Sequence, residues 1–315
     1  MTNVLVCGRF YVYKLPRAVG GRSEEEGLEY LLLEKGSEAW AKGSVNINHT
    51  NGAVGRTVGQ LYTCCTAHPP PPLSPGVVVL DKEQGFWLVH STPHFPPPQQ
   101  AGNYSYPDTG LTNGQSFLCV TYPLERFHTI GEQLHINQPH VYDCHVPEAL
   151  ASLVPSLSTL SPPPLTPVSN RSVVLNSSEG TAFISFAKGA AFNNDLYHSW
   201  VARELHCPLL VQFWVRSTGV LPSDCSEGVT VLNIQLLSPG PSPSFNNTVD
   251  HSKWAVSPEG AQAGGGWVCV GDINRNHAEE RRGGGTVCLQ DPLVWKAYRS
   301  AALQCQDCEG RTTTC

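Results

Sequence analysis

Short apolar segments bounded by glycine or proline recur along this chain, and this pattern limits its fold more than any other feature. Five of them, all before residue 124, are rich in β-branched and aromatic residues and predict strands. They are 9–16, 28–34, 76–81, 85–91 and 115–123. The later segments 208–215 and 229–237 have the continuous apolar character of buried strands.

Two segments of the second half predict helices. The first has its apolar residues on one helical face and follows three polar residues, any of which suits the capping position. The apolar residues are Leu196, Trp200, Val201 and Leu205, and the candidate caps are Asn193, Asn194 and Asp195. The second begins at Asp291-Pro292 and carries Val294, Ala297, Tyr298 and Ala301 on one face. Strands mixed with helices predict an α/β fold in which both sheet faces are covered.

A proline-rich segment divides the chain near its middle. Residues 152–169 are rich in proline, serine, threonine and leucine, and we expect them to form neither a sheet ladder nor a helix. This predicts an N-terminal half over 1–151, a junction over 152–169 and a C-terminal half over 170–315. We expect a second proline-dominated stretch, 64–76, to be irregular or polyproline-like.

The charge balance bears on the partners that the chain can bind. The net charge is -6 at pH 7, which does not fit a basic nucleic-acid binder at neutral pH. There are 12 histidines, however, and their full protonation in acid would bring the net charge to +6. The same chain would then repel DNA at neutral pH and attract it in acid, unless these histidines are ordinary surface residues. No apolar run is long enough to span a membrane, so we expect no membrane insertion.

Cysteines and glycosylation sequons favour the secretory route over the cytosol. The chain has 12 cysteines, which suits disulfides in an oxidising compartment. Five N-x-S/T sequons predict glycosylation at Asn48, Asn103, Asn170, Asn176 and Asn246. The first residues lack the charged and apolar regions of a signal peptide. We therefore expect the true N-terminus to be missing from this sequence; the alternative is a protein that is not exported.

His251 and Lys253 form an H-x-K pair that fits phosphodiester chemistry. Alone it is a weak signal, but residues two apart on an extended strand project to one face and are able to meet one phosphate. Histidine can attack phosphorus or protonate a leaving oxygen, while lysine neutralises charge on the phosphate oxygens, and this chemistry needs no metal.

The segment 266–285 strengthens this interpretation. An apolar strand is followed there by Asp272, Asn274, Asn276, Glu279, Glu280, Arg281, Arg282 and three glycines. Amides and arginines hold phosphate oxygens, a carboxylate can orient a histidine, and glycines let backbone N–H groups approach an anion. The alternative is a glycine-rich surface loop, which the nearby H-x-K pair makes less favoured.

Many separate motifs resemble the deoxyribonuclease II family, in one order from about residue 9 to 308. They are VYKLP (12–16), GAVGRT (52–57), GFWLVHSTPHFPPP (85–98), ISFAK (184–188), DLYHSW (195–200), VQFWV (211–215), LPSDCS (221–226), GPSPSFNNTVDHSKW (240–254) and CVGDINRNHAEERRGGGTVC (269–288). The family is similar to the phospholipase D superfamily, in which two H-x-K half-sites share a pseudo-twofold α/β/α sandwich.

The resemblance implies a lysosomal acid endonuclease without cofactor or metal. It would hydrolyse double-stranded DNA to 3′-phosphate ends, with one histidine as nucleophile and another as general acid, in a monomer or homodimer. His251 and Lys253 match the family's H-S-K, and Asp272, Asn274 and Asn276 match its G-D-x-N-R-N stretch. His90 matches the histidine of F-W-L-V-H-S, and either supports the site or is a buried structural residue.

The first half-site departs from the family. Where the family has H-T-K-G, this chain reads Leu73-Ser74-Pro75-Gly76, and only His251 has a lysine two residues later. Three explanations compete. Residues 64–76 are a sequence error; the protein is an impaired relative that binds DNA without cleaving it; or, least favoured, His68 or His90 substitutes. A lipid phosphodiesterase is a weaker possibility that rests on superfamily analogy alone.

The resemblance also implies disulfides. It pairs Cys269 with Cys288, Cys7 with Cys119, and Cys225 with either Cys305 or Cys308. It assigns no partner to the remaining cysteines, which include Cys64, Cys65, Cys144, Cys207 and Cys315. Cys305 and Cys308 have the spacing of half a zinc site, but no second close pair is near in the sequence, so we disfavour a metal site.

Overall fold

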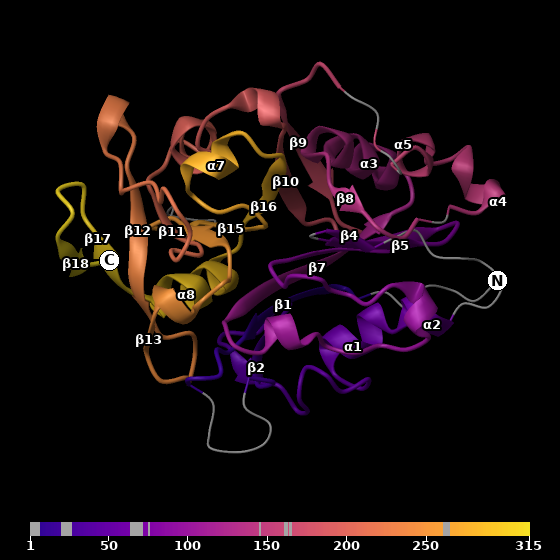
Figure 1. Ribbon diagram of the computed structural model, residues 1–315, viewed down its shortest axis with the longest axis horizontal. Coiled ribbons are helices and arrows are strands. Elements are labelled where there is room, and N and C mark those ends of the chain that lie inside the picture. Colours follow the sequence, from indigo (N-terminus) through magenta and orange to yellow (C-terminus); the bar gives the residue numbers. More distant parts are fainter. Residues whose placement is uncertain are drawn as a thin grey trace.

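A computed structural model describes residues 7–19, 27–63, 72–74, 76–144, 146–160, 163, 166–260 and 265–315. The protein has a mixed α/β fold in which two large sheets are each built from one part of the chain (Figure 1). None of the helices formed by the described residues has the length and apolar character needed to span a bilayer. Cys64, Cys65 and His68 lie outside the described residues.

The N-terminal sheet has the order β3-β2-β1-β7-β6-β5-β4-β8, with antiparallel pairing throughout. Its strands are β1 (Arg9–Lys14), β2 (Tyr30–Glu34), β3 (Ala41–Lys42), β4 (Pro72–Ser74), β5 (Gly76–Leu80), β6 (Gln84–His90), β7 (Gln115–Pro123) and β8 (His140–Val141). Its helices are α1 (Ala53–Val58), α2 (Gln60–Thr63), η1 (Gln99–Ala101), η2 (Asp108–Gly110), α3 (Arg126–Asn137), α4 (Glu148–Ala151) and α5 (Pro155–Ser158). All five strands predicted before residue 124 are present.

The C-terminal sheet has the order β18-β17-β12-β11-β14-β15-β16-β10-β9, with β13 beside β12. Its strands are β9 (Asn170–Asn176), β10 (Ala182–Lys188), β11 (Leu209–Gln212), β12 (Val231–Leu237), β13 (Phe245–Asn246), β14 (Trp254–Val256), β15 (Trp267–Gly271), β16 (Gly284–Gln290), β17 (Ala302–Gln306) and β18 (Thr312–Thr314). The helical elements are η3 (Ala190–Phe192), η4 (Tyr197–Val201), α6 (Ala202–Glu204), η5 (Ser226–Gly228), η6 (Asn247–Val249), α7 (His277–Glu280) and α8 (Pro292–Ala301). The parallel pair is β11 with β12.

The two sheets share a run of four antiparallel strands in the same relative order. In the first sheet the run is β1-β7-β6-β5, and in the second it is β10-β16-β15-β14. In each run, the strand that comes first in the chain pairs with the strand that comes last. The three later strands pair in chain order and form an antiparallel meander. The H-x-K pair directly precedes β14, and Leu73-Ser74-Pro75 directly precedes β5.

Alternate residues of β5 bury two faces of the N-terminal sheet, as expected for a covered strand. Val77 and Val79 pack with α1 and α2, whereas Val78 and Leu80 belong to the central core with Phe127 of α3. Figure 1 shows α3 and α5 on one side of β4 and β5, and α1 and α2 on the other. Each fully buried valine contributes roughly 1.5 kcal/mol or more to folding.

Helix α8 joins the two sheets in one core. Its Tyr298 ring lies 5.2 Å from Trp254 of β14 and 5.2 Å from Trp40, which belongs to the N-terminal part. The Trp40 indole N–H donates to the carbonyl of Ala297 at 3.2 Å. The helix begins as the sequence predicts, because the Asp291 carboxylate accepts the N–H groups of Leu293 and Val294. The halves therefore share a central core, and each half has a further apolar cluster of its own.

The prediction for residues 152–169 is wrong in one respect, because this segment contains a short helix. Pro155 begins α5, and Ser156 donates its hydroxyl to the carbonyl of His128 in α3 at 2.6 Å. Val154, Leu157 and Leu160 are at most 1% exposed and belong to the central core. The segment is proline-rich, yet the apolar residues of its described part, 152–160, recur every three positions and pack against the core.

The described residues form four disulfides. Cys7–Cys119 and Cys269–Cys288 are the pairs that the resemblance implied, and Cys225 pairs with Cys308. Cys305 pairs instead with Cys315, a cysteine to which the resemblance gave no partner. Both cysteines of the Cys305/Cys308 pair are thus engaged in disulfides, while Cys144 and Cys207 are free thiols.

Candidate active site

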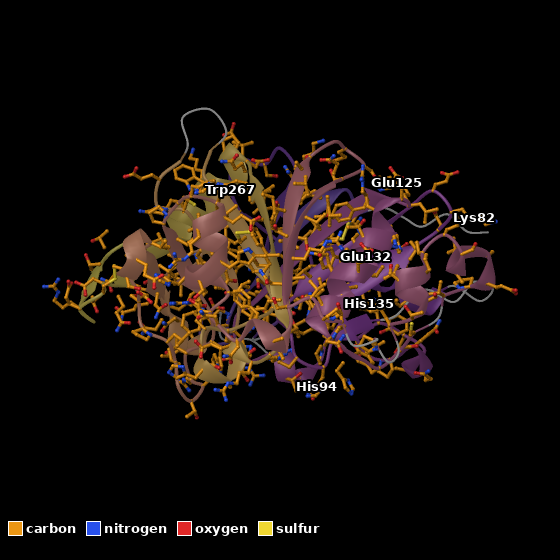
Figure 2. All side chains as sticks on the ribbon, turned by 90° about the horizontal axis from the view of Figure 1, so that it is seen from above. Lys82, His94, Glu125, Glu132, His135 and Trp267 are labelled. Atoms are coloured by element: carbon orange, nitrogen blue, oxygen red, sulfur yellow. A yellow bond between two sulfur atoms is a disulfide. The ribbon has the colours of Figure 1, made fainter. Side chains whose placement is uncertain are left out.

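A cavity of about 590 Å³ lies where the two halves meet. The N-terminal half lines it with the segment after β6, between Ser91 and Pro98, and with His140 and Tyr142. The C-terminal half contributes His251, Lys253, Asp272, Asn274 and Arg282. His94, which is in the N-terminal lining, lies at the boundary of the two halves in Figure 2. The structure thus brings most of the predicted site residues to one cavity.

Residues 251–253 are held in place by the N-terminal half. The His251 N–H donates to the carbonyl of Gly114 at 2.8 Å, and the Lys253 N–H donates to the Ser116 hydroxyl at 3.0 Å. Gly114 allows this close approach, because a Cβ on it would lie 2.3 Å from Oδ1 of Asp250. The H-x-K pair is therefore positioned by β7 and the residue before it, which no local sequence pattern reveals.

The side chains of His251 and Lys253 lie together. Lys253 Nζ is 3.3 Å from His251 Nδ1 and donates to the His251 carbonyl at 2.8 Å. Burial, and then the charge of Lys253, lowers the pKa of His251 to about 3. Burial also lowers the pKa of Lys253, to about 8. In mild acid, His251 is accordingly a neutral imidazole beside a charged ammonium.

An indole, that of Trp214, and an amide, that of Asn274, hold the His251 ring in place. The Trp214 ring lies 4.5 Å from it, centroid to centroid, with an interplanar angle of 38°. The Oδ1 atom of Asn274 accepts the backbone N–H of Trp214 at 3.2 Å. Asn274 therefore acts on the histidine through Trp214, a residue that the sequence analysis quoted within VQFWV but did not assign to the site.

A buried hydrogen-bond cluster lies behind the H-x-K pair. The Asp250 carboxylate accepts the N–H of Ser252 at 3.0 Å and its hydroxyl at 2.8 Å, and it also accepts the hydroxyl of Tyr13. Burial raises the pKa of Asp250. Tyr13 comes from β1, so this cluster is a second connection between the halves. No local sequence pattern indicates this cluster, because Tyr13 lies 237 residues before Asp250.

Asp272 lines the cavity beside the glycine-rich turn. Its Oδ1 accepts the Gly285 N–H at 2.7 Å, and burial raises its pKa to about 6. Arg282 also lines the cavity and pairs with Glu279 at 2.9 Å. Lys188 holds the backbone of this turn by donating to the carbonyls of Glu279, Glu280 and Arg282 at 2.9, 3.0 and 2.6 Å. Lys188 therefore holds the backbone of Arg282 in place, and Arg282 lines the same cavity as the H-x-K pair.

Asn276 does not line the cavity. It caps α7 by accepting the Glu279 N–H at 3.0 Å, and it donates to the Ser217 hydroxyl at 2.9 Å. It shapes the loop that carries Asp272 and Asn274 without facing the cavity.

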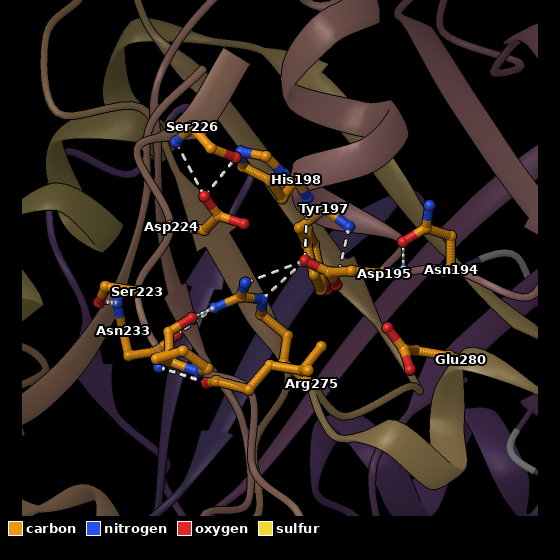
Figure 3. A network of polar contacts seen from close by, with 12 residues as sticks. Asn194, Asp195, Tyr197, His198, Ser223, Asp224, Ser226, Asn233, Arg275 and Glu280 are labelled. Carbon is orange, nitrogen blue, oxygen red and sulfur yellow. Dashed lines mark hydrogen bonds and ion pairs between the residues drawn. The ribbon is translucent and has the colours of Figure 1, made fainter. Parts of the chain in front are cut away.

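Arg275, which lies between Asn274 and Asn276 in the chain, anchors the same loop (Figure 3). It is 1% exposed, and its Nε and Nη2 donate to Oδ2 of Asp195 at 3.0 and 2.9 Å. Its Nη1 donates to the side chain of Asn233. Asp195 also accepts the N–H groups of Tyr197 and His198, so among the three predicted candidates it is the residue that caps the helical segment.

His90 lies behind the cavity wall and does not face the cavity. It is 0% exposed, and its ring is 5.3 Å from Phe95 and 5.7 Å from Phe117. Burial lowers its pKa to about 3. Its sequence neighbours Ser91 and Thr92 do line the cavity, so His90 supports the wall from within.

The replaced half-site has a different backbone path from the intact one. Leu73 pairs with both Gly76 of β5 and Val141 of β8, so the chain turns back immediately before β5. Residues 251–253 instead run directly into β14. Pro75 lies outside the described residues. Of the two histidines named in the least favoured explanation, His90 is buried away from the cavity, and His68 lies outside the described residues.

Comparisons with known proteins identify the family of this chain. A family model described as Deoxyribonuclease II matches residues 9–69 and 72–308. Deoxyribonuclease-2-alpha of Rattus norvegicus is 44% identical over 323 residues, which cover 95% of this chain and 91% of the rat protein. Deoxyribonuclease-2-beta of Homo sapiens is 33% identical, with 95% of this chain and 88% of the human protein covered. Plancitoxin-1 of Acanthaster planci is also 33% identical, covering 95% and 89%. The chain belongs to the deoxyribonuclease II family.

Proposed function

We propose that this protein is an acid endonuclease that hydrolyses double-stranded DNA without a metal ion and leaves 3′-phosphate ends. The observation that carries the proposal is the contact between His251 and Lys253 in a cavity that Arg282 also lines. The names of the relatives, Deoxyribonuclease-2-alpha and Deoxyribonuclease-2-beta, supply the substrate class.

The chemistry follows from the charge of each group in mild acid. His251, with its pKa lowered to about 3, keeps a free ring nitrogen at about pH 5, so it suits the nucleophile. Its attack would form a phosphorus–nitrogen bond and break the bond to the 5′ oxygen, and water would then release the 3′-phosphate. Lys253 and Arg282 are cations placed to neutralise the phosphate oxygens.

Two further parts of the proposal concern architecture and location. The repeated strand order supports a phospholipase D-like sandwich of two pseudo-twofold-related halves, 1–151 and 170–315, joined by 152–169. The disulfides support an oxidising compartment, and a lysosomal role in DNA degradation accords with the proposed acid chemistry. Four sequon asparagines, Asn48, Asn103, Asn176 and Asn246, are exposed, and Asn170 is partly exposed.

Cleavage of supercoiled plasmid in EDTA at about pH 5 tests the proposal. We expect nicked and linear products from the parent chain, and a loss of at least about 10³-fold in rate for His251→Ala, because the nucleophile is removed. His277→Ala is the matched control, since that side chain is 70% exposed and outside the cavity. Cleavage that persists at the parent rate in His251→Ala would refute the assignment.

Leu73-Ser74-Pro75 motivates a second candidate, a protein that binds DNA without cleaving it. This candidate predicts binding of a labelled duplex at about pH 5 that weakens as salt is raised, with no nicking above background. Detection of 3′-phosphate ends that depend on His251 would exclude it.

A further inference from the structure

An active site with one intact H-x-K half lacks an evident proton donor for the leaving oxygen. His251 is neutral in mild acid, and Lys253 is needed as a cation, so another group that lines the cavity has to give the proton. Among the described residues, the N-terminal lining carries two imidazoles, those of His94 and His140.

His140 has the more favourable place of the two. It is the first residue of β8 and lies opposite Ser74 of β4, so it is on the strand beside the replaced half-site. A neighbouring cavity of about 200 Å³ adjoins the large one. Both cavities are lined by His140, Asp272 and Arg282, which places this histidine where the proposed phosphate-binding arginine reaches the N-terminal half. His94 lines the large cavity but not the smaller one.

The other acidic protons near the cavity are less suited. Burial raises the pKa of Tyr142, and its hydroxyl donates to the carbonyl of Pro96. Asp272 comes from the same half as His251, and its Oδ1 is already engaged with the Gly285 N–H. His140 is exposed, so it has access to substrate and solvent.

We propose that His140 takes the role of the missing second imidazole, supplied by the strand next to the one that lost it. This proposal rests on the proposed nuclease function. As His251 attacks phosphorus, the imidazolium of His140 gives its proton to the departing 5′ oxygen. The neutral His140 then takes a proton from water as that water attacks phosphorus, which breaks the phosphorus–nitrogen bond and regenerates both histidines.

Two substrates with different leaving groups separate this role from a structural one. Plasmid DNA releases a poor leaving group that needs a proton, whereas bis(p-nitrophenyl) phosphate releases nitrophenolate, which does not. For His140→Gln we expect plasmid cleavage at about pH 5 to fall by roughly 10²-fold or more. The same variant should release one nitrophenolate per active site at close to the parent rate and then stall, because hydrolysis of the histidine adduct has lost its base.

His277→Gln and His251→Ala complete the experiment. His277 is 70% exposed and outside the cavity, so His277→Gln should cleave plasmid within a few-fold of the parent, whereas His251→Ala should lose both reactions. If His140→Gln cleaves plasmid like the parent, or loses the nitrophenolate burst as well, the assignment of His140 is wrong while the nuclease function stands. A parent chain that cleaves neither substrate contradicts the nuclease function itself. Thermal unfolding checks that each variant is folded.

Discussion

His251 and His90 have similarly lowered pKa values, yet they differ in what they are able to do. Both are lowered to about 3 by burial, but His251 lines the cavity and His90 is enclosed by aromatic rings. A lowered pKa alone therefore does not identify a reacting group. Contact with the cavity and with Lys253 separates the two histidines.

His90→Leu tests the structural role of His90. A histidine whose folded pKa lies below its unfolded value of about 6.5 stabilises the fold above that pH and loses this contribution as pH falls towards 3. The variant should therefore gain stability relative to the parent on acidification, by about 2 kcal/mol at pH 5, while it cleaves DNA within a few-fold of the parent rate. Urea unfolding across this pH range, with His277→Ala as control, measures the effect. A large loss of cleavage in a folded His90→Leu would show that the residue does more than support the wall.

At the level of single residues, the sequence predicts the local part of the site and misses the rest. His251, Lys253, Asp272 and Asn274 are close in the chain and meet in the cavity. Gly114, Trp214 and His140 are distant in sequence and have no motif that links them to the H-x-K pair, so only the tertiary fold reveals their place.

Among the elements, the strands follow from composition, whereas most of the helices are not predicted, and α3 is missed despite a visible pattern. The predicted strand 115–123 matches β7 at both ends, because β-branched and aromatic residues suit a covered strand. Helix α3 was not predicted, although Phe127, Ile130 and Leu134 recur at helical spacing and are buried. The polar residues between them, with a glycine among them, obscured that periodicity.

The loop that carries the site depends on Arg275. The guanidinium bonds to Asp195, and both groups are at most 8% exposed, so removal of one charge leaves the other buried and unpaired. We expect Arg275→Ala to lower the free energy of unfolding by about 3–5 kcal/mol. Arg281→Ala should change it by less than about 0.5 kcal/mol, because that side chain is exposed. Equal unfolding midpoints for the two variants in urea would contradict this role of the buried pair.

At the scale of the whole molecule, the site exists because the halves are interlocked. Tyr13, Gly114 and Ser116 of the N-terminal half hold residues 250–253 of the C-terminal half. The N-terminal half thus contributes to the site even though it carries Leu73-Ser74-Pro75 in place of an H-x-K pair. The α/β class was predictable from the strand and helix patterns, but this interlocking was not, since it depends on pairing between distant segments.

Detection of a covalent intermediate on His251 tests the central claim most directly. The protein is mixed with bis(p-nitrophenyl) phosphate at about pH 5 in EDTA, quenched into alkali within one turnover, digested and analysed by mass spectrometry. A nitrophenyl phosphate adduct on the peptide that contains His251, absent in His251→Ala, is the predicted result. Turnover with the adduct on another residue, or turnover that persists in His251→Ala, would contradict the account.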